Sequence, residues 1–462
     1  MKVLLINPYE LGRQPFGLAE PAAWLAREDC DVSCCDLSLQ RLDNCLTADT
    51  DIVAIYVAMH TATRIAVEAL PKIRRLAPGA HLCVYGLYAP MNEPLLRTLG
   101  VDTVIGGEYE SGLVQLVRNL RAGRPGATDI PRINLGKTSF LLPDRSRLPA
   151  LSRYASLILP DGTHRTVGFT ETTRGCKYHC RHCPIVPVYE GRFFVVPAAV
   201  VLADIRAQVA AGAQHISFGD PDFFNGPGHA LRIVRAMRAE FPALTFDATI
   251  KVEHLVKYPD EIRELGKLGC LFILSAVEAL DDAILTRLDK GHTRADFLAA
   301  LALMRAAGID LAPTFVAFTP WTTLDGYIDL LRQLAALQLV EAVAPVQLSI
   351  RLLIPAGSRV LGIAGMQETV GAFDPATLGH PWRNPDARVD ALQQAVADWI
   401  TRAEAADTPR GEIFRGIWRL AWEIRGQAAP ALDLAAAGSP VPRLSENWYC
   451  CAEPTCEQLV SF

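Results

Sequence analysis

The stretch TVGFTETTRGCKYHCRHCP, residues 166–184, joins a short β-rich run to three closely spaced cysteines. The run TVGFTET is rich in Thr, Val and Phe, which favours a strand. Cys176, Cys180 and Cys183 follow in C-x3-C-x2-C spacing. Thiolates select zinc or iron–sulfur clusters, and a loop can turn three of them toward one point. The stretch therefore predicts a metal-binding loop at the carboxyl end of a strand.

The number of cysteines in this loop bears on the identity of the metal. An ordinary [4Fe–4S] cluster takes four cysteine ligands, whereas this loop supplies three and the sequence around it offers no obvious fourth. Three ligands leave one iron open to the amine and carboxylate of a small molecule, as a catalytic metal site keeps an open position. The alternative is a structural zinc loop, with Cys270 or a C-terminal cysteine as its fourth ligand.

Strand and helix patterns alternate on both sides of the loop. Six strand patterns separated by helical patterns fill residues 165–355, and they cover residues 166–172, 215–220, 244–250, 270–278, 310–318 and 343–353. Repeated β/α units of this kind predict a parallel sheet curled into a barrel or a partial barrel. Such sheets bind ligands at the carboxyl ends of their strands, which is where the three cysteines fall.

The first 122 residues form a second alternating unit. Its strand patterns cover residues 2–8, 30–37, 51–59, 81–86 and 102–107. Their continuous Val, Ile and Leu runs are typical of strands buried on both faces of a doubly wound parallel sheet. A linker rich in Gly, Pro and Arg (123–164) leads to the barrel, and residues 356–462 add two helical patterns and a cysteine-rich tail. The expected fold class is therefore α/β, with a doubly wound sheet, a partial (β/α)6 barrel and a helical C-terminal region.

Composition narrows the classes of function. The chain has 462 residues, of which 50% are hydrophobic and 21% charged, and a net charge of −5. A nucleic-acid-binding domain would carry a basic balance, and a membrane-spanning helix needs roughly 18 consecutive apolar residues. The first apolar run is too short for a signal peptide. We expect a cytoplasmic protein without nucleic-acid or membrane partners, in which Cys30, Cys34, Cys35 and Cys45 are core residues.

The cysteine loop after the first barrel strand resembles the radical S-adenosylmethionine (SAM) superfamily over residues 165–355. The resemblance implies that Cys176, Cys180 and Cys183 hold a [4Fe–4S] cluster whose open iron binds the amino and carboxylate groups of SAM. One electron then cleaves a carbon–sulfur bond, and the protein positions the cofactor that does this chemistry. The resemblance further implies a transferase that receives its electron from a donor such as flavodoxin or ferredoxin.

The resemblance also suggests which side chains contact SAM. Asp220 and Asp222 end the second strand in a degenerate form of the family's Gly-Gly-Glu motif, near the SAM amino group, where a backbone carbonyl is the safer contact. Ser275 and Glu278 end the fourth strand, where the family places polar groups near the ribose and the carboxylate. The alternative for Glu278 is a solvated loop carboxylate. Lys251, after the third strand, is a weaker candidate.

Two further candidates lie on the later strands. Phe318 ends the fifth strand, where adenine packing is implied, and its alternative is an ordinary core position. Arg351 is a charge inside an apolar run, and such a charge is rarely buried without a partner. We expect Arg351 to line the mouth of the barrel, with a salt bridge at the strand edge as the alternative.

The N-terminal unit resembles the cobalamin-binding domain that precedes the barrel in a large radical SAM subgroup. The supporting residues are Asn7-Pro8, Gly86, Gly106-Gly107-Glu108 and the segment 285–309. The Asp-x-His-x-x-Gly loop that binds base-off cobalamin in other proteins does not follow Asn7. Because a fold does not imply a function, cobalamin binding stays open beside a domain that binds nothing or only packs on the barrel.

Three cysteines near the C-terminus form a second thiol group. Cys450, Cys451 and Cys456 lie within seven residues, and three soft donors suit a soft metal, a metalloid or a redox role. The ending resembles radical SAM proteins with a Cys-Cys-Ala-Glu-Pro tail, a neighbourhood that includes transfer of a SAM-derived carbon fragment to trivalent arsenic. We therefore predict these cysteines as catalytic residues, with an oxidisable tail of no catalytic role as the alternative.

These observations leave three hypotheses of function. The favoured one is a radical SAM transferase that acts on a small substrate, including As(III) held by the tail cysteines. The second is a cobalamin-dependent radical SAM methyltransferase of a small molecule or a peptide. The third is a non-catalytic thiol-rich protein that binds a metal or metalloid.

Overall fold

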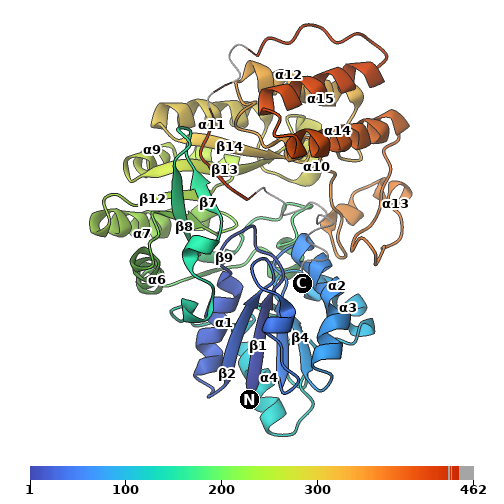
Figure 1. Cartoon of the computed structure of the whole chain (residues 1–462). Helices are drawn as coiled ribbons and strands as arrows, with labels where there is room; N and C mark the ends of the chain where they lie inside the picture. Colours follow the sequence, from blue (N-terminus) through green and yellow to red (C-terminus); the bar gives the residue numbers. More distant parts are fainter. Residues whose placement is uncertain (435–437, 439, 447–462) are drawn as a thin grey trace.

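The computed structural model describes residues 1–434, 438 and 440–446. Figure 1 shows two stacked units, with the N-terminal sheet and its helices below and the barrel above, and with helices α14 (Ala387–Ala405) and α15 (Arg410–Ile424) along the far side of the barrel. Among the described residues, no helix is long and apolar enough to cross a membrane.

The N-terminal unit is a parallel sheet in the order β2-β1-β3-β4-β5-β6. Its strands are β1 (Lys2–Asn7), β2 (Asp31–Asp36), β3 (Ile52–Tyr56), β4 (His81–Tyr85), β5 (Thr103–Gly107) and β6 (Ile133–Asn134). Alternate residues of a strand face opposite sides of the sheet. Val3 and Leu5 therefore pack under α1 (Phe16–Ala26) and α4 (Glu110–Arg121), whereas Leu4 and Ile6 pack under α2 (His60–Leu76) and α3 (Glu93–Thr98). This is the doubly wound arrangement expected from the sequence.

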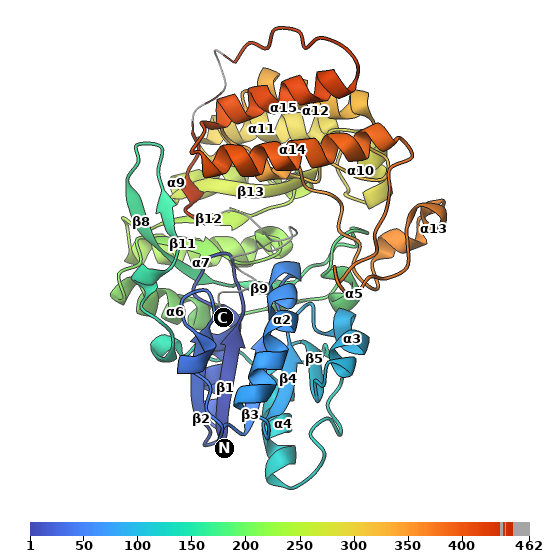
Figure 2. The same ribbon diagram turned by 45° about the vertical axis from the view of Figure 1, so that its right-hand side comes forward.

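The second sheet runs in the order β14-β13-β12-β11-β8-β7-β15. Its five parallel strands are β8 (His164–Thr170), β11 (His215–Phe218), β12 (Thr245–Thr249), β13 (Cys270–Glu278) and β14 (Asp310–Phe315). Two short strands, β7 (Ser156–Ile158) and β15 (Arg443–Leu444), extend it in antiparallel fashion. The sheet is an open half-barrel, and Figure 2 shows its strands crossing the upper unit beneath α14 and α15.

The sixth predicted strand, residues 343–353, is reduced to a single bridge between Phe318 and Arg351. A 3-10 turn, Pro345–Leu348, takes up the start of this segment. Proline has no N–H to donate to a strand ladder, so Pro345 accounts for the missing pairing. The residues expected to form a linker also contribute structure, because β6 joins the N-terminal sheet and β7 joins the half-barrel.

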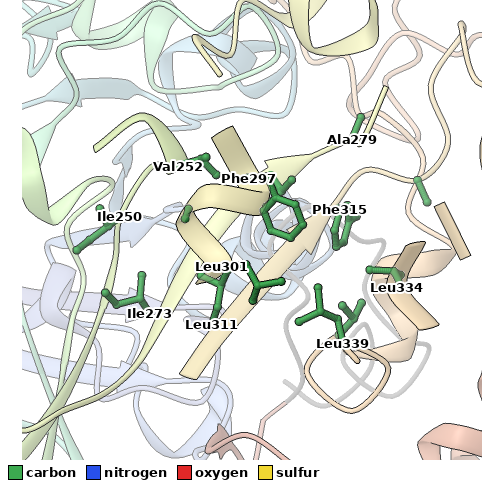
Figure 3. Close-up of a cluster of buried hydrophobic side chains, with 14 of the residues drawn as sticks. Ile250, Val252, Ile273, Ala279, Phe297, Leu301, Leu311, Phe315, Leu334 and Leu339 are labelled. Carbon is green, nitrogen blue, oxygen red and sulfur yellow. The ribbon is translucent and has the colours of Figure 1, made fainter. Parts of the chain in front are cut away.

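Helices cover the outer face of the half-barrel. They are α6 (Ala198–Ala210), α7 (Pro227–Glu240), α8 (Val252–Lys257), α9 (Pro259–Lys267), α10 (Asp282–Leu288), α11 (Arg294–Ala307) and α12 (Leu324–Ala336). Figure 3 shows the core between sheet and helices, where Ile273 and Phe315 of the strands meet Phe297 and Leu301 of α11. This core faces away from the open side of the half-barrel, which leaves the carboxyl ends of the strands free to carry polar groups.

Candidate active site

The three cysteines of the central motif lie in a loop that a short hairpin frames. β9 (Thr173–Gly175) pairs with β10 (Phe193–Val195) on either side of the loop. Gly175 has a φ of +75°, and a Cβ there would lie 2.6 Å from the Arg192 carbonyl. A larger residue would be strained and would clash with backbone. Glycine is therefore required at position 175 for the chain to turn from the hairpin into the loop.

Asp220 fixes the start of this loop. Its carboxylate accepts hydrogen bonds from the Thr172 amide at 2.9 Å, the Thr172 hydroxyl at 2.6 Å and the Thr173 hydroxyl at 2.7 Å. Burial raises the pKa of Asp220 to about 6, although these donors oppose the rise. Asp220, predicted as a SAM contact, thus holds the chain that leads to the cysteines.

The cysteine thiols are shielded from water. Cys180 is buried, and Cys176 and Cys183 are half-buried. Burial raises the pKa of Cys176 to about 11 and that of Cys183 to about 12, and neighbouring thiols add to both shifts. Such thiols stay protonated at neutral pH until a metal displaces the protons. The donor set therefore suits a metal centre.

The arrangement of the metal-binding side chains bears on the two metals considered from the sequence. In the part of the chain that the structure describes, no three His, Cys, Asp or Glu side chains converge on a position for one ion. An iron–sulfur cube does not require such convergence, because each thiolate binds a different iron. The alternative in which Cys270 is the fourth zinc ligand was wrong. It begins β13, eight residues before Glu278 at the other end of the strand, a separation of about 26 Å.

A buried ion pair lies beside the loop. Glu278 ends β13 with a φ of +68°, and its Oε1 accepts hydrogen bonds from Lys290 Nζ at 3.2 Å and His182 Nε2 at 3.1 Å. Burial disfavours the charged carboxylate, but Lys290 and His182 outweigh it and hold the pKa of Glu278 well below its usual range. The alternative of a solvated loop carboxylate was wrong. Because His182 stands between Cys180 and Cys183, the pair is tied to the cysteine loop.

A second group of polar side chains contacts the loop at Tyr178. The hydroxyl of Tyr178 lies 2.7 Å from His254 Nε2 and donates to Glu253 at 3.1 Å. His254 Nδ1 in turn lies 2.8 Å from Asp222, and both side chains are fully buried. The Lys251 ammonium lies 3.2 Å from the centre of the Tyr178 ring. Asp222 and Lys251, both predicted at the SAM site, therefore help to fix Tyr178 between Cys176 and Cys180.

The remaining residues predicted to contact SAM have partners outside the cysteine loop. Ser275 is buried and donates to the Ile250 carbonyl at 2.7 Å. Phe318 is buried and stacks on Tyr327 with ring centres 4.7 Å apart, as its core alternative predicts. Arg351 pairs with Asp390 of α14 at 2.8 Å and lies 3.9 Å over the ring of Trp382, which agrees with the salt-bridge alternative. Contact of these three residues with SAM stays a prediction.

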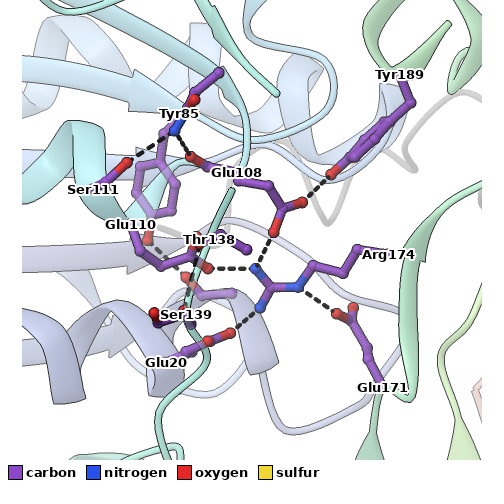
Figure 4. Close-up of polar contacts among 12 residues, drawn as sticks. Glu20, Tyr85, Glu108, Glu110, Ser111, Thr138, Ser139, Glu171, Arg174 and Tyr189 are labelled. Atoms are coloured by element: carbon purple, nitrogen blue, oxygen red, sulfur yellow. Dashed lines mark hydrogen bonds and ion pairs between the residues drawn. The ribbon is translucent and has the colours of Figure 1, made fainter. Parts of the chain in front are cut away.

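Arg174 connects the loop to the N-terminal unit (Figure 4). This buried guanidinium pairs with the carboxylates of Glu20 on α1, Glu108 after β5, Glu110 on α4 and Glu171 after β8. Burial raises the pKa of Glu108 to about 7 and places those of Glu110 and Glu171 well above their usual values. Because Arg174 lies two residues before Cys176, this contact fixes the cysteine loop against the first domain.

The glycines that suggested a cobalamin domain are explained by packing within the chain. A Cβ on Gly86 would lie 2.9 Å from the Val57 carbonyl and 3.0 Å from the Tyr56 ring, and one on Gly106 would clash with Pro90. A cavity of about 430 Å³ does lie at the carboxyl ends of β1 and β2, lined by Tyr9 and Tyr154 among others. The place expected for a ligand is thus available, although the glycines do not form it.

A cysteine loop at the carboxyl edge of an open parallel half-barrel defines a class of cluster-binding barrel proteins. Residues 170–325 match the family model of the radical SAM superfamily. These residues form a radical SAM domain, which indicates an enzyme and implies a [4Fe–4S] cluster and SAM as its cofactors.

Two solved structures share the architecture of most of the chain. The cobalamin-dependent radical SAM enzyme OxsB, with aqua-cobalamin bound, is 16% identical, with 87% of this chain and 67% of that chain covered and a TM-score of 0.66. The radical SAM methyltransferase TsrM from Kitasatospora setae, with cobalamin and a [4Fe–4S] cluster bound, is 19% identical, with 73% and 70% covered and a TM-score of 0.57. At this identity the likeness shows the fold, including an N-terminal domain of the cobalamin-binding type.

A curated relative covers a smaller part of the chain. The tRNA-2-methylthio-N(6)-dimethylallyladenosine synthase of Mannheimia succiniciproducens is 24% identical over 236 residues, which are 48% of this chain and 46% of that protein. The chain spans about half the length of this relative.

Sequence reasoning missed several residues around the loop. Lys290 lies in segment 285–309, and His182 and Arg174 lie in residues 166–184. No sequence pattern or spacing predicts which residues they pair with. Residue contacts across the sheet decide these roles. Cys450, Cys451 and Cys456 lie outside the described residues, so their predicted role stays a prediction.

Proposed function

We propose that this enzyme holds a [4Fe–4S] cluster through Cys176, Cys180 and Cys183, cleaves SAM reductively and transfers a SAM-derived carbon group to a small substrate. The observation that carries the proposal is the position of the three shielded thiols, at the carboxyl edge of the half-barrel and tied through His182 to the Glu278–Lys290 pair. When bound, the cluster and SAM supply a carbon-centred reactive group from a sulfonium.

The chain's own residues would orient these groups. Lys290 and Glu278 present one positive and one negative charge in a buried setting, which matches the carboxylate and the ammonium or hydroxyl groups of SAM. Asp220 and the Tyr178–His254–Asp222 group hold the loop in place from two sides. Ser275, Phe318 and Arg351 stay proposed contacts of SAM, and in the structure their side chains bond or stack on groups of the surrounding strands and helices.

Cobalamin-dependent methyl transfer is the second candidate function. It is favoured by the cavity of about 430 Å³ at the carboxyl edge of the N-terminal sheet, next to the half-barrel. OxsB and TsrM, which share the fold, are described with cobalamin bound. Uptake of cobalamin by the purified protein, followed by its visible spectrum, tests this function, and a protein that takes up none would remove it.

The finer hypothesis of carbon transfer to As(III) depends on Cys450, Cys451 and Cys456. Three thiolates match the trigonal coordination of As(III), and thiolates are soft ligands. The Cys451→Ala variant tests it. We expect cluster assembly to be unchanged and turnover with As(III) to be lost, whereas full turnover would assign the tail no part in the reaction.

The central experiment is anaerobic reconstitution with iron and sulfide, followed by SAM and dithionite. Formation of 5′-deoxyadenosine indicates hydrogen abstraction, and formation of methylthioadenosine indicates transfer of the aminocarboxypropyl group. A cluster-loaded protein that yields neither product contradicts the proposal. Zinc without iron or sulfide in the purified protein would favour the non-catalytic metal-binding hypothesis instead.

A further inference from the structure

Three arginines lie close together at the cysteine loop. Arg181, which lies between Cys180 and Cys183, donates to the carbonyl of Arg287 in α10 at 3.2 Å. The carbonyl of Arg181 accepts a hydrogen bond from Ser358 at 3.4 Å, and the adjacent Arg359 donates to His179 at 3.3 Å. These contacts bring the loop, α10 and the turn Arg359–Gly362 together. We call Arg181, Arg287 and Arg359 the arginine face.

The arginine face carries positive charge without compensation. Within the described ranges, none of its three guanidinium groups forms an ion pair, and Arg287 and Arg359 are exposed. Other arginines of the half-barrel are paired with carboxylates, as Arg206 is with Glu240 at 2.6 Å and Arg235 is with Glu264 at 2.6 Å. Those that form no ion pair with a described residue, such as Arg232, lie on the outer helices, away from the cysteine loop. The whole chain has a net charge of −5, so the face has the opposite sign to the rest of the molecule.

We propose that the arginine face is the docking surface for a small acidic one-electron carrier protein. The inference rests on the proposed function, because a carrier is required only if the loop holds a cluster. In the transfer, an anionic flavin hydroquinone loses one electron and becomes the neutral semiquinone, while the cluster changes from the 2+ to the 1+ state. No proton or further reactant is needed.

The arrangement suits a protein partner better than a small anion. The three guanidinium groups come from three segments and bond to separate backbone and ring groups, so they form a broad surface. Exposed arginines are enriched at protein interfaces, and complementary charge speeds the encounter of two proteins. Because Arg181 lies between Cys180 and Cys183 in the sequence, a carrier docked here would contact the cysteine loop itself.

Binding is measured first, without turnover. The probe is a purified bacterial flavodoxin in its oxidised form, and its Kd for the full-length protein is measured at about 0.05 M and about 0.5 M salt. The test variant combines Arg287→Glu with Arg359→Glu. The matched control combines Arg75→Glu with Arg124→Glu, which make the same charge change at exposed positions of the N-terminal unit.

We expect the test variant to raise the Kd roughly tenfold at low salt and the control to raise it less than about twofold, with the difference lost at high salt. A test variant that binds as the parent does, or a control that weakens binding equally, overturns the inference. If the double charge reversal lowers the unfolding temperature, Arg287→Ala with Arg359→Ala replaces it, with the same expected direction.

The reductant separates this inference from the proposed function. With dithionite, the test variant should cleave SAM at the rate of the parent, and with reduced flavodoxin its rate should fall roughly in proportion to the lost affinity. A parent that does not cleave SAM with dithionite contradicts the proposed function, while the binding comparison still decides the docking surface. A test variant that loses the dithionite-driven reaction also overturns the inference, because its arginines would then act within the site.

Discussion

Two buried clusters combine carboxylates with cations, and their charge balance differs. In the half-barrel, the single carboxylate of Glu278 faces Lys290 and His182. Between the domains, the single guanidinium of Arg174 faces four carboxylates, those of Glu20, Glu108, Glu110 and Glu171. The pKa of Glu278 is accordingly lowered, whereas burial raises the pKa values of Glu108, Glu110 and Glu171.

The different ratio of cations to carboxylates indicates different roles for the two clusters. A carboxylate with sufficient cations keeps its charge across the working pH range, which suits a group that orients a charged cofactor. Carboxyl groups in excess keep protons instead, so their contribution to domain contact depends on pH. The half-barrel cluster is therefore a fixed part of the site, and the Arg174 cluster is a titratable joint between the domains.

The largest effect is expected from the loop that the balanced cluster serves. In Cys180→Ala, one of the three proposed cluster ligands is lost, and iron bound after anaerobic reconstitution should fall to near zero together with SAM cleavage. Cys270→Ala is the matched control, since that thiol lies at the opposite end of β13 and should leave iron content unchanged. Full iron loading of Cys180→Ala would mean that the loop is not the metal site.

The next largest effect is expected when the positive charge beside Glu278 is removed. Lys290→Met leaves the buried carboxylate of Glu278 with the half-buried His182 only, and loss of one partner of a buried pair costs about 3–5 kcal/mol of unfolding free energy. Urea denaturation measures this loss. In the double variant Lys290→Met with Glu278→Leu both charges are removed, so most of the stability should return. A single variant as stable as the parent would show that the pair carries no buried charge.

The sequence predicted the elements whose signal is local. The spacing of Cys176, Cys180 and Cys183, the continuous apolar strands and the helical patterns between them predicted both sheets, and β13 begins and ends at the predicted residues. The strand expected at 343–353 was not formed as predicted, because a proline-initiated turn at Pro345 interrupts its pairing.

Other roles depend on residues far apart in the sequence. Asp220 and Asp222 were predicted to contact SAM, which stays a prediction. The sequence did not indicate that Asp220 bonds the threonines that start the loop or that Asp222 lies 2.8 Å from His254. Arg174 looked like an ordinary residue before a Gly-Cys turn, although its partners come from as far as Glu20. No local pattern encodes such pairs, since the fold alone brings them together.

A smaller effect is expected when Arg174 is removed. The carboxyl groups around it can keep protons, so Arg174→Met should cost less than Lys290→Met, about 1–3 kcal/mol for the lost charged hydrogen bonds. Arg235→Met, which removes an exposed pair with Glu264, is the control and should cost less than about 1 kcal/mol. Urea denaturation at neutral pH compares the three variants, and a loss from Arg174→Met that equals that from Lys290→Met would end the distinction between the two clusters.

The smallest and most specific effect is the pH dependence of the joint. Burial raises the pKa of Glu108 from its ordinary 4.5 to about 7. The folded state therefore keeps a proton that the unfolded state releases, so Glu108 alone should lower the unfolding free energy by about 3 kcal/mol as pH rises from about 4.5 to about 7. The raised pKa values of Glu110 and Glu171 add to this fall in the same direction.

Glu278 does not disturb this window. Its pKa is lowered, so its contribution is fully present above its ordinary pKa and is lost only at lower pH. In Glu108→Gln the side chain carries no titratable proton, and the slope of unfolding free energy against pH should become flatter between about 4.5 and about 7. Glu264→Gln, at an exposed pair, is the control that should keep the parent's slope. If the parent and Glu108→Gln have the same slope, Glu108 is already ionised in the folded protein at neutral pH. The excess of carboxylates over Arg174 would then not keep protons on Glu108.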